Sequence, residues 1–260
     1  MSRPTSLAPA LAAMAAIARP EPLADAGLHF GFGCADVDVR LGGGLVPAAL
    51  HEVFAAGEGD EPAAAGFALL LALRGARPGP VIWLREDKAR MNGRPYGLGL
   101  ADLGFDPARL LLVQAPDTLA VLRAGADAVA CAAVATVIIE PWGKATALDL
   151  TATRRLALAA ARSGVTTLLL RTGDPPPSAA SSRWQVAAAT SAALLANAPG
   201  MPAFDVTLLR HRGGIAGFST RLEWDRDRRA FGTALPGVAP AVAAQRTRAP
   251  RASPARRRVA

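Results

Sequence analysis

The residues between positions 41 and 73 have the order of a phosphate-binding site but lack the side chains that bind phosphate. An apolar run at 51–54 precedes a loop of small residues at 55–62, and a helix-forming run at 63–73 follows. A strand, a glycine-bearing loop and a helix form the context of the G-x-x-x-x-G-K-[ST] motif, whose backbone N–H groups, lysine and hydroxyl hold a nucleotide's phosphates and magnesium. The sequence therefore predicts a scaffold of this kind.

The loop lacks the chemistry of that motif in both possible registers. In the register that begins at Gly57, the positions of the second glycine, the lysine and the hydroxyl hold Pro62, Ala63 and Ala64. In the register that begins at Gly59, they hold Ala64, Ala65 and Gly66. The loop carries three acids instead, Glu58, Asp60 and Glu61. Because these acids would repel a triphosphate, we expect no ATP turnover and no cofactor. Bound ATP with magnesium is the alternative.

Length and charge indicate one large domain with a basic end. The chain has 260 residues, 51% of them hydrophobic, and a net charge of +8. The segment 246–260 contains no acid and six arginines, namely Arg246, Arg248, Arg251, Arg256, Arg257 and Arg258. Such a tail predicts an acidic partner, for example nucleic acid, and a solvated disordered end is the alternative.

The remaining compositional signals predict a cytoplasmic protein. Cys34 and Cys131 have neither metal-ligand spacing nor a disulfide framework, which suits a reducing compartment. Arg3 and the apolar run at 7–17 resemble a weak signal peptide, but the run is mostly alanine and Pro9 interrupts it. We also find no uncharged stretch that reads as a membrane span, and therefore expect no membrane association.

Apolar runs and helical patterns alternate through the first two thirds of the chain. Buried strands are predicted at 49–54, 81–84, 110–113, 136–139 and 166–170. Helices are predicted at 63–73, at 118–133 with Asp117 as N-cap, and at 148–163 with Gly164 closing the helix. This alternation predicts βαβ units, and hence an α/β fold with a mainly parallel sheet and helices on both faces.

The pattern changes after a proline-rich loop at 174–178. Strands predicted at 187–195, 204–211, 217–223 and 229–233, with a turn at Gly213 and Gly214, form an antiparallel extension. The predicted organisation has three parts. An arm and lead-in cover 1–40, with a helix or loose arm to about 20 and a strand-turn region to Gly44. A core domain covers 41–236, and a disordered tail rich in Pro, Ala and Arg covers 237–260.

The order of several short motifs resembles the RecA/RadA recombinase family over about 42–233. They are Leu41-Gly42-Gly43-Gly44-Leu45-Val46-Pro47, Leu103-Gly104-Phe105-Asp106, Leu110-Leu111-Leu112-Val113-Gln114, Pro116-Asp117-Thr118 and Val137-Ile138-Ile139-Glu140. In that family the first motif leads into the P-loop strand and the second forms a turn. The third and fourth together form a strand that ends in Q-P-D-T, and the fifth is the Walker B strand. The resemblance implies a RecA-like P-loop NTPase fold.

The resemblance also assigns roles to individual positions. Glu140 stands at the Walker B aspartate, and Glu86 at the catalytic glutamate, which has nothing to act on without a held γ-phosphate. Arg171-Thr172 stands where an asparagine-glutamine pair would sense the γ-phosphate. The two DNA-binding loops are reduced to a few residues around Gly143-Lys144 and to a short stretch at 173–182. Trp142 follows a predicted central strand, where we hypothesise that it plugs the emptied pocket.

Within this superfamily, four segments resemble the ImuA family. They are Leu50-His51-Glu52-Val53-Phe54, Ser182-Arg183-Trp184-Gln185-Val186, Phe204-Asp205-Val206-Thr207-Leu208 and Arg221-Leu222-Glu223-Trp224. That resemblance implies a shortened RecA-like protein in damage-inducible (SOS) mutagenesis. Its implied partners are an ImuB-like Y-family polymerase homologue and an error-prone replicative-type DNA polymerase, with RecA and DNA as further candidates. We predict a non-catalytic adaptor. The alternatives are an ATP-dependent recombinase-like ATPase and a DNA-binding protein that acts through the arginine tail.

Two further groups of residues carry expectations. The histidines His29, His51 and His211 have no partner at catalytic spacing, so structural roles are expected. The cluster Arg85, Lys88, Arg90 and Arg94 follows the second predicted strand, with Asn92-Gly93 as a turn. It predicts an exposed loop, and the functional alternative is contact with DNA phosphate or an acidic partner.

Overall fold

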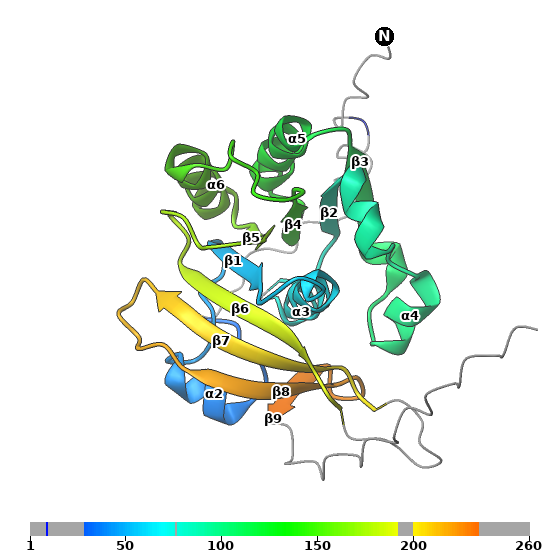
Figure 1. Ribbon diagram of the computed structural model, residues 1–260, viewed down its shortest axis with the longest axis vertical. Helices are drawn as coiled ribbons and strands as arrows, with labels where there is room; N and C mark the ends of the chain where they lie inside the picture. The colour runs from blue at the N-terminus through cyan, green and yellow to red at the C-terminus, as the bar shows by residue number, and fades with distance from the viewer. Residues whose placement is uncertain (1–8, 10–28, 76, 192–199, 234–260) are drawn as a thin grey trace, which may run out of the picture.

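The computed structural model describes residue 9 and residues 29–75, 77–191 and 200–233 (Figure 1). The predictions for the N-terminal arm at 1–20, the strand residues beyond 191 and the tail at 237–260 lie outside the described residues.

The described residues form one nine-stranded sheet in the order β3-β2-β4-β5-β1-β6-β7-β8-β9. The strands are β1 Leu50–Ala55, β2 Val81–Glu86, β3 Leu110–Ala115, β4 Thr136–Glu140, β5 Thr166–Arg171, β6 Ser182–Ala189, β7 Ala203–His211, β8 Ser219–Asp225 and β9 Ala230–Thr233. The pairings from β3 to β6 are parallel. Those from β6 to β9 are antiparallel. The predicted α/β fold with a mainly parallel sheet and an antiparallel extension is therefore confirmed.

Helices cover both faces of the parallel part (Figure 1). The three long helices are α3 Glu61–Arg74, α5 Thr118–Ala130 and α6 Leu150–Ser163. The short ones are α2 Ala35–Arg40, α4 Gly97–Asp102, and the 3₁₀ helices η1 Asp87–Asn92 and η2 Pro107–Arg109. Helices α5 and α6 pack against each other on one face, and α3 packs on the other.

Alternation of side chains along each strand divides the apolar residues between two cores, because successive residues of a strand point to opposite faces. In β2, Trp83 packs on the α3 side, whereas Ile82 and Leu84 pack under α5 and α6. In β4, Ile138 faces α3 and Ile139 faces α5. The central strands are buried on both faces, which explains why they are continuous apolar runs in the sequence.

Local capping signals set the ends of the long helices. The Asp117 carboxylate accepts a hydrogen bond of 2.8 Å from the Ala120 N–H and begins α5, as predicted. Asp149 begins α6 in the same way through the Ala152 N–H at 2.7 Å. Gly164 follows α6 with a φ of 77°, the left-handed conformation that glycine adopts without strain.

Two predictions of local structure were wrong in part. The region before Gly44, predicted as strand and turn, contains α2, because the Asp38 carboxylate turns back to accept from the Phe32 and Gly33 N–H groups at 2.6 and 3.0 Å. Strand β6 begins at Ser182, five residues before the predicted start at 187. Its first residues are polar and buried, so a pattern of apolar side chains does not mark them as a strand.

In the described part of the chain, no helix has the length and apolar character that crossing a bilayer requires.

Candidate functional site

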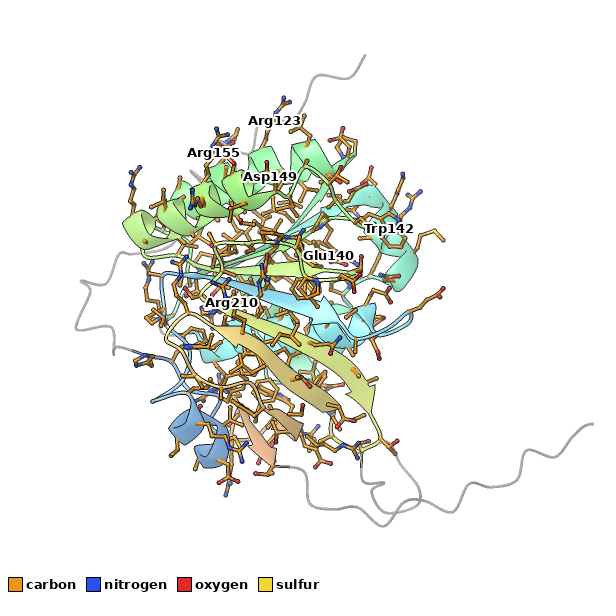
Figure 2. All side chains as sticks on the ribbon, turned by 60° about the vertical axis from the view of Figure 1, so that its left-hand side comes forward. Arg123, Glu140, Trp142, Asp149, Arg155 and Arg210 are labelled. Carbon is orange, nitrogen blue, oxygen red and sulfur yellow. The ribbon has the colours of Figure 1, made fainter. Side chains whose placement is uncertain are left out.

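A pocket of about 170 Å³ lies at the ends of β1, β4 and β5, beside the start of α3. Its lining residues are Ala55, Glu61, Ala64, Asn92, Glu140, Pro141, Trp142, Gly143, Leu170, Arg171 and Thr172. Figure 2 shows Glu140 and Trp142 at the same end of the sheet. This is where the predicted phosphate-binding loop joins its helix, and several positions that the sequence singled out line the hollow, namely Glu140, Trp142, Arg171 and Thr172.

The predicted phosphate loop contributes little to this pocket. Gly57, Gly59 and Pro62 are exposed, Ala63 is half-buried, and only Ala64 of the five predicted residues lines the hollow. The Gly59 N–H donates a hydrogen bond of 2.9 Å to the Glu61 carboxylate. A carboxylate of the chain itself therefore accepts from a loop amide of the kind that holds an anion in a P-loop.

A second acid of the loop fastens the neighbouring strand. The Asp60 carboxylate accepts a hydrogen bond of 2.9 Å from the Ala188 N–H in β6. Although Asp60 is the residue before α3, its side chain does not cap that helix. The acidic loop is therefore tied to the sheet through Asp60 and closed on itself through Glu61.

Glu140, which the resemblance to the RecA/RadA family aligns with the Walker B aspartate, lies in a buried cluster at the end of β4. Arg85 Nε donates to Glu140 Oε2 at 2.5 Å and Arg85 Nη2 donates to Oε1 at 3.0 Å. The indole N–H of Trp83 also donates to Oε2, at 2.8 Å. Both carboxylate oxygens thus already accept hydrogen bonds from this protein's own side chains.

Burial raises the pKa of the Glu140 carboxyl above its ordinary value, and the hydrogen bonds and charge of Arg85 and the Trp83 N–H oppose that rise. The side chains of Arg85 and Glu140 form an ion pair in which both partners are almost fully shielded from water. Removing one member of a buried pair leaves the other charge uncompensated, which is strongly destabilising. The arrangement is that of a structural ion pair.

Glu86, which the resemblance aligns with the catalytic glutamate of that family, also forms hydrogen bonds within the protein. Its Oε2 atom accepts from the Thr118 hydroxyl at 2.7 Å and from the Trp142 backbone N–H at 3.1 Å. These bonds join the end of β2 to the start of α5 and to the turn after β4. Trp142 is half-buried and lines the pocket.

The structure corrects the prediction for the basic cluster after β2. Arg85 belongs to β2 and is buried, not part of an exposed loop. Its guanidinium reaches Glu140 because the two residues are register partners on adjacent strands. Lys88, Arg90 and Arg94 are exposed, as predicted.

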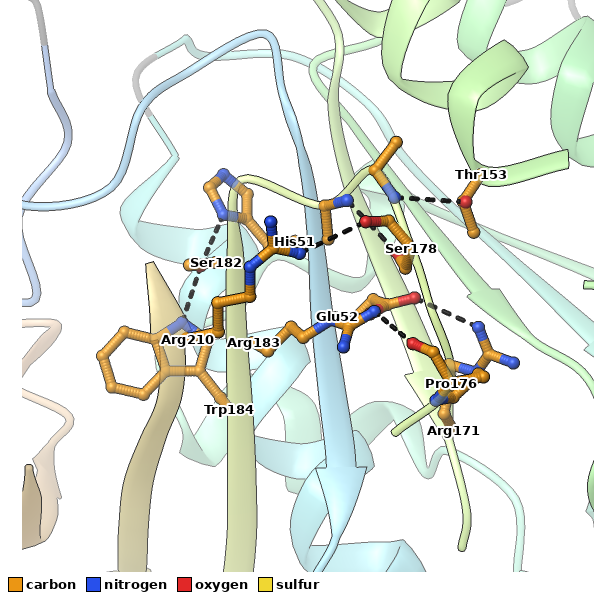
Figure 3. Close-up of polar contacts among 12 residues, drawn as sticks. His51, Glu52, Thr153, Arg171, Pro176, Ser178, Ser182, Arg183, Trp184 and Arg210 are labelled. Carbon is orange, nitrogen blue, oxygen red and sulfur yellow. Dashed lines mark hydrogen bonds and ion pairs between the residues drawn. The ribbon is translucent and has the colours of Figure 1, made fainter. Parts of the chain in front are cut away.

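Sequence reasoning missed a buried ionic triad across the three central strands (Figure 3). Glu52 in β1 is fully buried, and Arg171 Nη1 donates to its Oε1 at 3.1 Å. Arg183 Nε in β6 lies 2.8 Å from Glu52 Oε2, in an ion pair with poor hydrogen-bond alignment. Arg171 also donates to the Leu148 carbonyl at 3.2 Å, and Arg183 to that of Pro176. The position aligned with a γ-phosphate sensor therefore holds an internal ion pair.

A neutral polar network lies on the opposite face of the same strands. His51 Nε2 lies 2.9 Å from the Val46 carbonyl, so it carries the proton, and Nδ1 accepts from the Ser182 hydroxyl at 2.8 Å. The Trp184 indole donates to the same hydroxyl oxygen at 2.8 Å. Burial lowers the pKa of His51 to about 4, although the Val46 hydrogen bond opposes this and the charge of His211 adds to it. This is the structural role expected for His51.

The sequence did contain a signal for both networks. His51-Glu52 and Ser182-Arg183 belong to two segments that carry the resemblance to the ImuA family. In the structure, they are register partners on adjacent parallel strands, His51 with Ser182 and Glu52 with Arg183. Because neighbouring residues of a strand face opposite sides, one dipeptide pair forms a neutral network on one face and an ion pair on the other.

Two further sets of predictions concern the arginine tail and metal binding. The tail arginines Arg246, Arg248, Arg251, Arg256, Arg257 and Arg258 lie outside the described residues. Within the described ranges, no group of three or more His, Cys, Asp or Glu residues has an arrangement that could hold a metal ion.

Comparison with known proteins finds relatives that are similar to this chain over about half of its length. It is 39% identical over 127 residues to Protein ImuA from two strains of Caulobacter vibrioides, NA1000 and CB 15. The match covers 47% of this chain and 48% of each relative, so it spans about half the length of the curated relatives. No family model matches the chain. The similarity confirms the resemblance to the ImuA family that the strand motifs indicated.

Proposed function

We propose that this chain of the ImuA family is a non-catalytic adaptor in SOS-inducible mutagenesis. In this role it recruits or organises an error-prone translesion polymerase complex through protein contacts, in the cytoplasm. The partners are the ImuB-like Y-family homologue and the error-prone replicative-type polymerase, and RecA and DNA are further candidates. The proposal combines the resemblance with the state of the pocket.

One observation carries the non-catalytic part of the proposal. Both acids that the resemblance aligns with ATPase chemistry accept hydrogen bonds inside the protein, Glu140 from Arg85 and Trp83, and Glu86 from Thr118 and the Trp142 backbone. A Walker B acid must order a magnesium-bound water and a catalytic base must face the attacking water. Both carboxylate oxygens of Glu140 are already engaged, and Glu86 is held through its Oε2 atom, which supports structural roles for the two acids.

The proposed fold family is the RecA-like P-loop class, with a degenerate site. Its support is the position of β1 between β5 and β6 in the parallel sheet, followed by the acidic loop and α3. A strand, loop and helix in this arrangement build the phosphate cradle of P-loop proteins. In this chain the corresponding hollow is lined by Glu61, Ala64 and Trp142, and the cation that also lines it, Arg171, is ion-paired with the buried Glu52. This supports a scaffold of the P-loop kind in which the lining cation is already engaged by the protein itself.

Co-purification with the two partner proteins, in the presence and absence of ATP and magnesium, tests the adaptor function. We expect the full chain to bind at least one partner with the same affinity in both conditions. Failure to bind either partner would refute the adaptor role. Binding that requires ATP, or DNA-stimulated phosphate release by pure protein, would favour the recombinase-like ATPase instead.

A further inference from the structure

The stretch that runs from η1 through its connection into the start of α4 exposes large apolar side chains together with cations. Met91, Tyr96 and Leu98 are 79%, 67% and 66% exposed, although they lie within eight positions of one another. Lys88, Arg90 and Arg94 lie in the same stretch and are also exposed. We refer to residues 88–98 as the basic-apolar segment.

The exposed side chains stand on a backbone that is anchored from within. Arg85 donates to the Ala89 carbonyl at 2.8 Å and to the Gly93 carbonyl at 2.9 Å, while its other contacts hold Glu140. Gly93 has a φ of 91°, which a residue with a side chain rarely adopts. The guanidinium of the buried ion pair therefore anchors the backbone of this segment at two carbonyl groups.

The end of the segment is held equally well. Ala89 and Leu100 are buried, and Leu100 belongs to the core that lies beneath α3. The Trp224 indole in β8 donates to the Leu103 carbonyl at 2.9 Å, which ties the end of α4 to the antiparallel strands. Met91, Tyr96 and Leu98 therefore face solvent even though buried apolar residues flank them on both sides, so lack of an available core does not explain their exposure.

We propose that the basic-apolar segment is the docking surface for an acidic, amphipathic segment of a protein partner. Tyrosine, methionine and arginine are the residue types enriched at protein interfaces, and exposed apolar groups edged by charge mark interaction sites. The side chains of Lys88, Arg90 and Arg94 form no ion pair with any described residue. The segment's immediate acidic neighbours, Asp87 and Asp102, stand outside it at the ends of η1 and α4. The surface is thus complementary to acids with apolar residues between them.

A protein segment fits these side chains better than single-stranded nucleic acid. Nucleic acid is held by cations and by aromatic rings on which bases stack. Only Tyr96 offers such a ring, whereas Met91 and Leu98 offer aliphatic contacts suited to apolar side chains of a partner. The anchored backbone also removes part of the ordering cost of association.

The inference rests on the proposed adaptor function. Its test uses the two partner proteins named above as probes, and each is tested separately for binding to the full chain. Two variants alter the surface, the charge reversal Lys88→Glu/Arg90→Glu/Arg94→Glu and the truncation Met91→Ala/Tyr96→Ala/Leu98→Ala. A matched control, Arg123→Glu/Arg154→Glu/Arg155→Glu, reverses three exposed arginines on α5 and α6. Figure 2 shows Arg123 and Arg155 on that outer helical layer.

We expect both surface variants to bind the partner at least about tenfold more weakly than the wild type, and the control to bind within about twofold. Unchanged thermal unfolding would show that the variants fold. If the wild type binds neither partner, the adaptor function fails and this inference fails with it. If the wild type binds but the surface variants bind equally well, only this inference is overturned. It is also overturned if the variants lose oligo-dT binding alone and keep the partner.

Discussion

Arg85 and Glu140 are register partners on strands β2 and β4, and Arg85 Nε lies 2.5 Å from Glu140 Oε2. Glu140 is the residue that the resemblance to the RecA/RadA family aligns with the acid that orders magnesium. The same guanidinium holds the Ala89 and Gly93 carbonyls. One buried interaction thus occupies the acid of the pocket and anchors the exposed segment beside it.

Replacing Glu140 by alanine is expected to destabilise the fold by about 3–5 kcal/mol, because it leaves the Arg85 charge buried without a partner. Urea unfolding of the variant and of the wild type measures the difference. Glu58→Ala, which removes an exposed acid of the loop, serves as the control and should change stability by less than about 0.5 kcal/mol. A loss below about 1 kcal/mol for Glu140→Ala would show that the pair is not structural.

ATP with magnesium is expected not to stabilise the wild-type chain. A ligand present at 100 times its Kd would stabilise the folded state by about 2.7 kcal/mol, so thermal or urea unfolding with millimolar nucleotide detects even modest affinity. A clear stabilisation by ATP that Glu140→Ala removes would contradict the proposed degenerate site.

Tryptophan fluorescence offers an independent test of the same pocket. Trp83, Trp184 and Trp224 are buried, whereas Trp142 is half-buried and lines the hollow. We hypothesise that Trp142 plugs the emptied pocket, and therefore expect its emission to be strongly protected from a soluble quencher. The contribution of Trp142 is obtained as the difference in emission between the wild type and a Trp142→Phe variant. ATP analogues should not alter that protection. Ready quenching of the Trp142 contribution, or its release by nucleotide, would argue against a plug.

The sequence predicted the repeating architecture well because the signals there are local. Strands buried on both faces are continuous apolar runs, and Asp117 and Gly164 mark helix ends by their own hydrogen bonds and backbone angles. The sheet of alternating elements follows from these signals. The position of the pocket also follows, since it lies where a loop joins a central strand to its helix.

The polar interior could not be predicted from such local signals. Glu52 and Arg183 are 131 residues apart in the sequence and belong to different strands. Only the strand order, which places β1 beside β6, brings them together. Arg85 was expected in a loop because charge in a sequence usually marks exposure. The burial of Arg85 depends on its ion pair with Glu140, and the pairing of β2 with β4 places these two residues side by side. Long-range pairing of this kind is set by topology.

Acid is expected to weaken the fold through His51. The folded chain holds His51 neutral with a pKa of about 4, below its ordinary value of 6.5, so between these pH values the unfolded chain binds more protons. Stability is therefore present above about pH 6.5 and falls as the pH drops toward 4, by about 3 kcal/mol for this group. Urea unfolding between pH 7 and pH 4.5 measures the slope.

The variant His51→Gln isolates that contribution. It is expected to be less stable than the wild type at pH 7, because a buried hydrogen-bond network is altered, but its stability should depend less on pH between 6.5 and 4. The partly buried His211, whose pKa burial also lowers, contributes in the same direction and remains in the variant. Equal pH slopes for wild type and variant would exclude His51 as a source of acid sensitivity.

The arginine tail is expected to bind DNA through phosphate contacts, independently of the pocket. Neutralisation of phosphates releases counterions, so the logarithm of the binding constant should fall linearly with the logarithm of salt concentration. Deleting residues 246–260, which contain six arginines and no acid, should weaken binding and flatten the slope. The matched control keeps the tail and carries Arg154→Glu/Arg155→Glu on α6. A deletion that leaves both the affinity and the salt slope unchanged would remove the tail from DNA binding and leave nucleic-acid contact to the core domain.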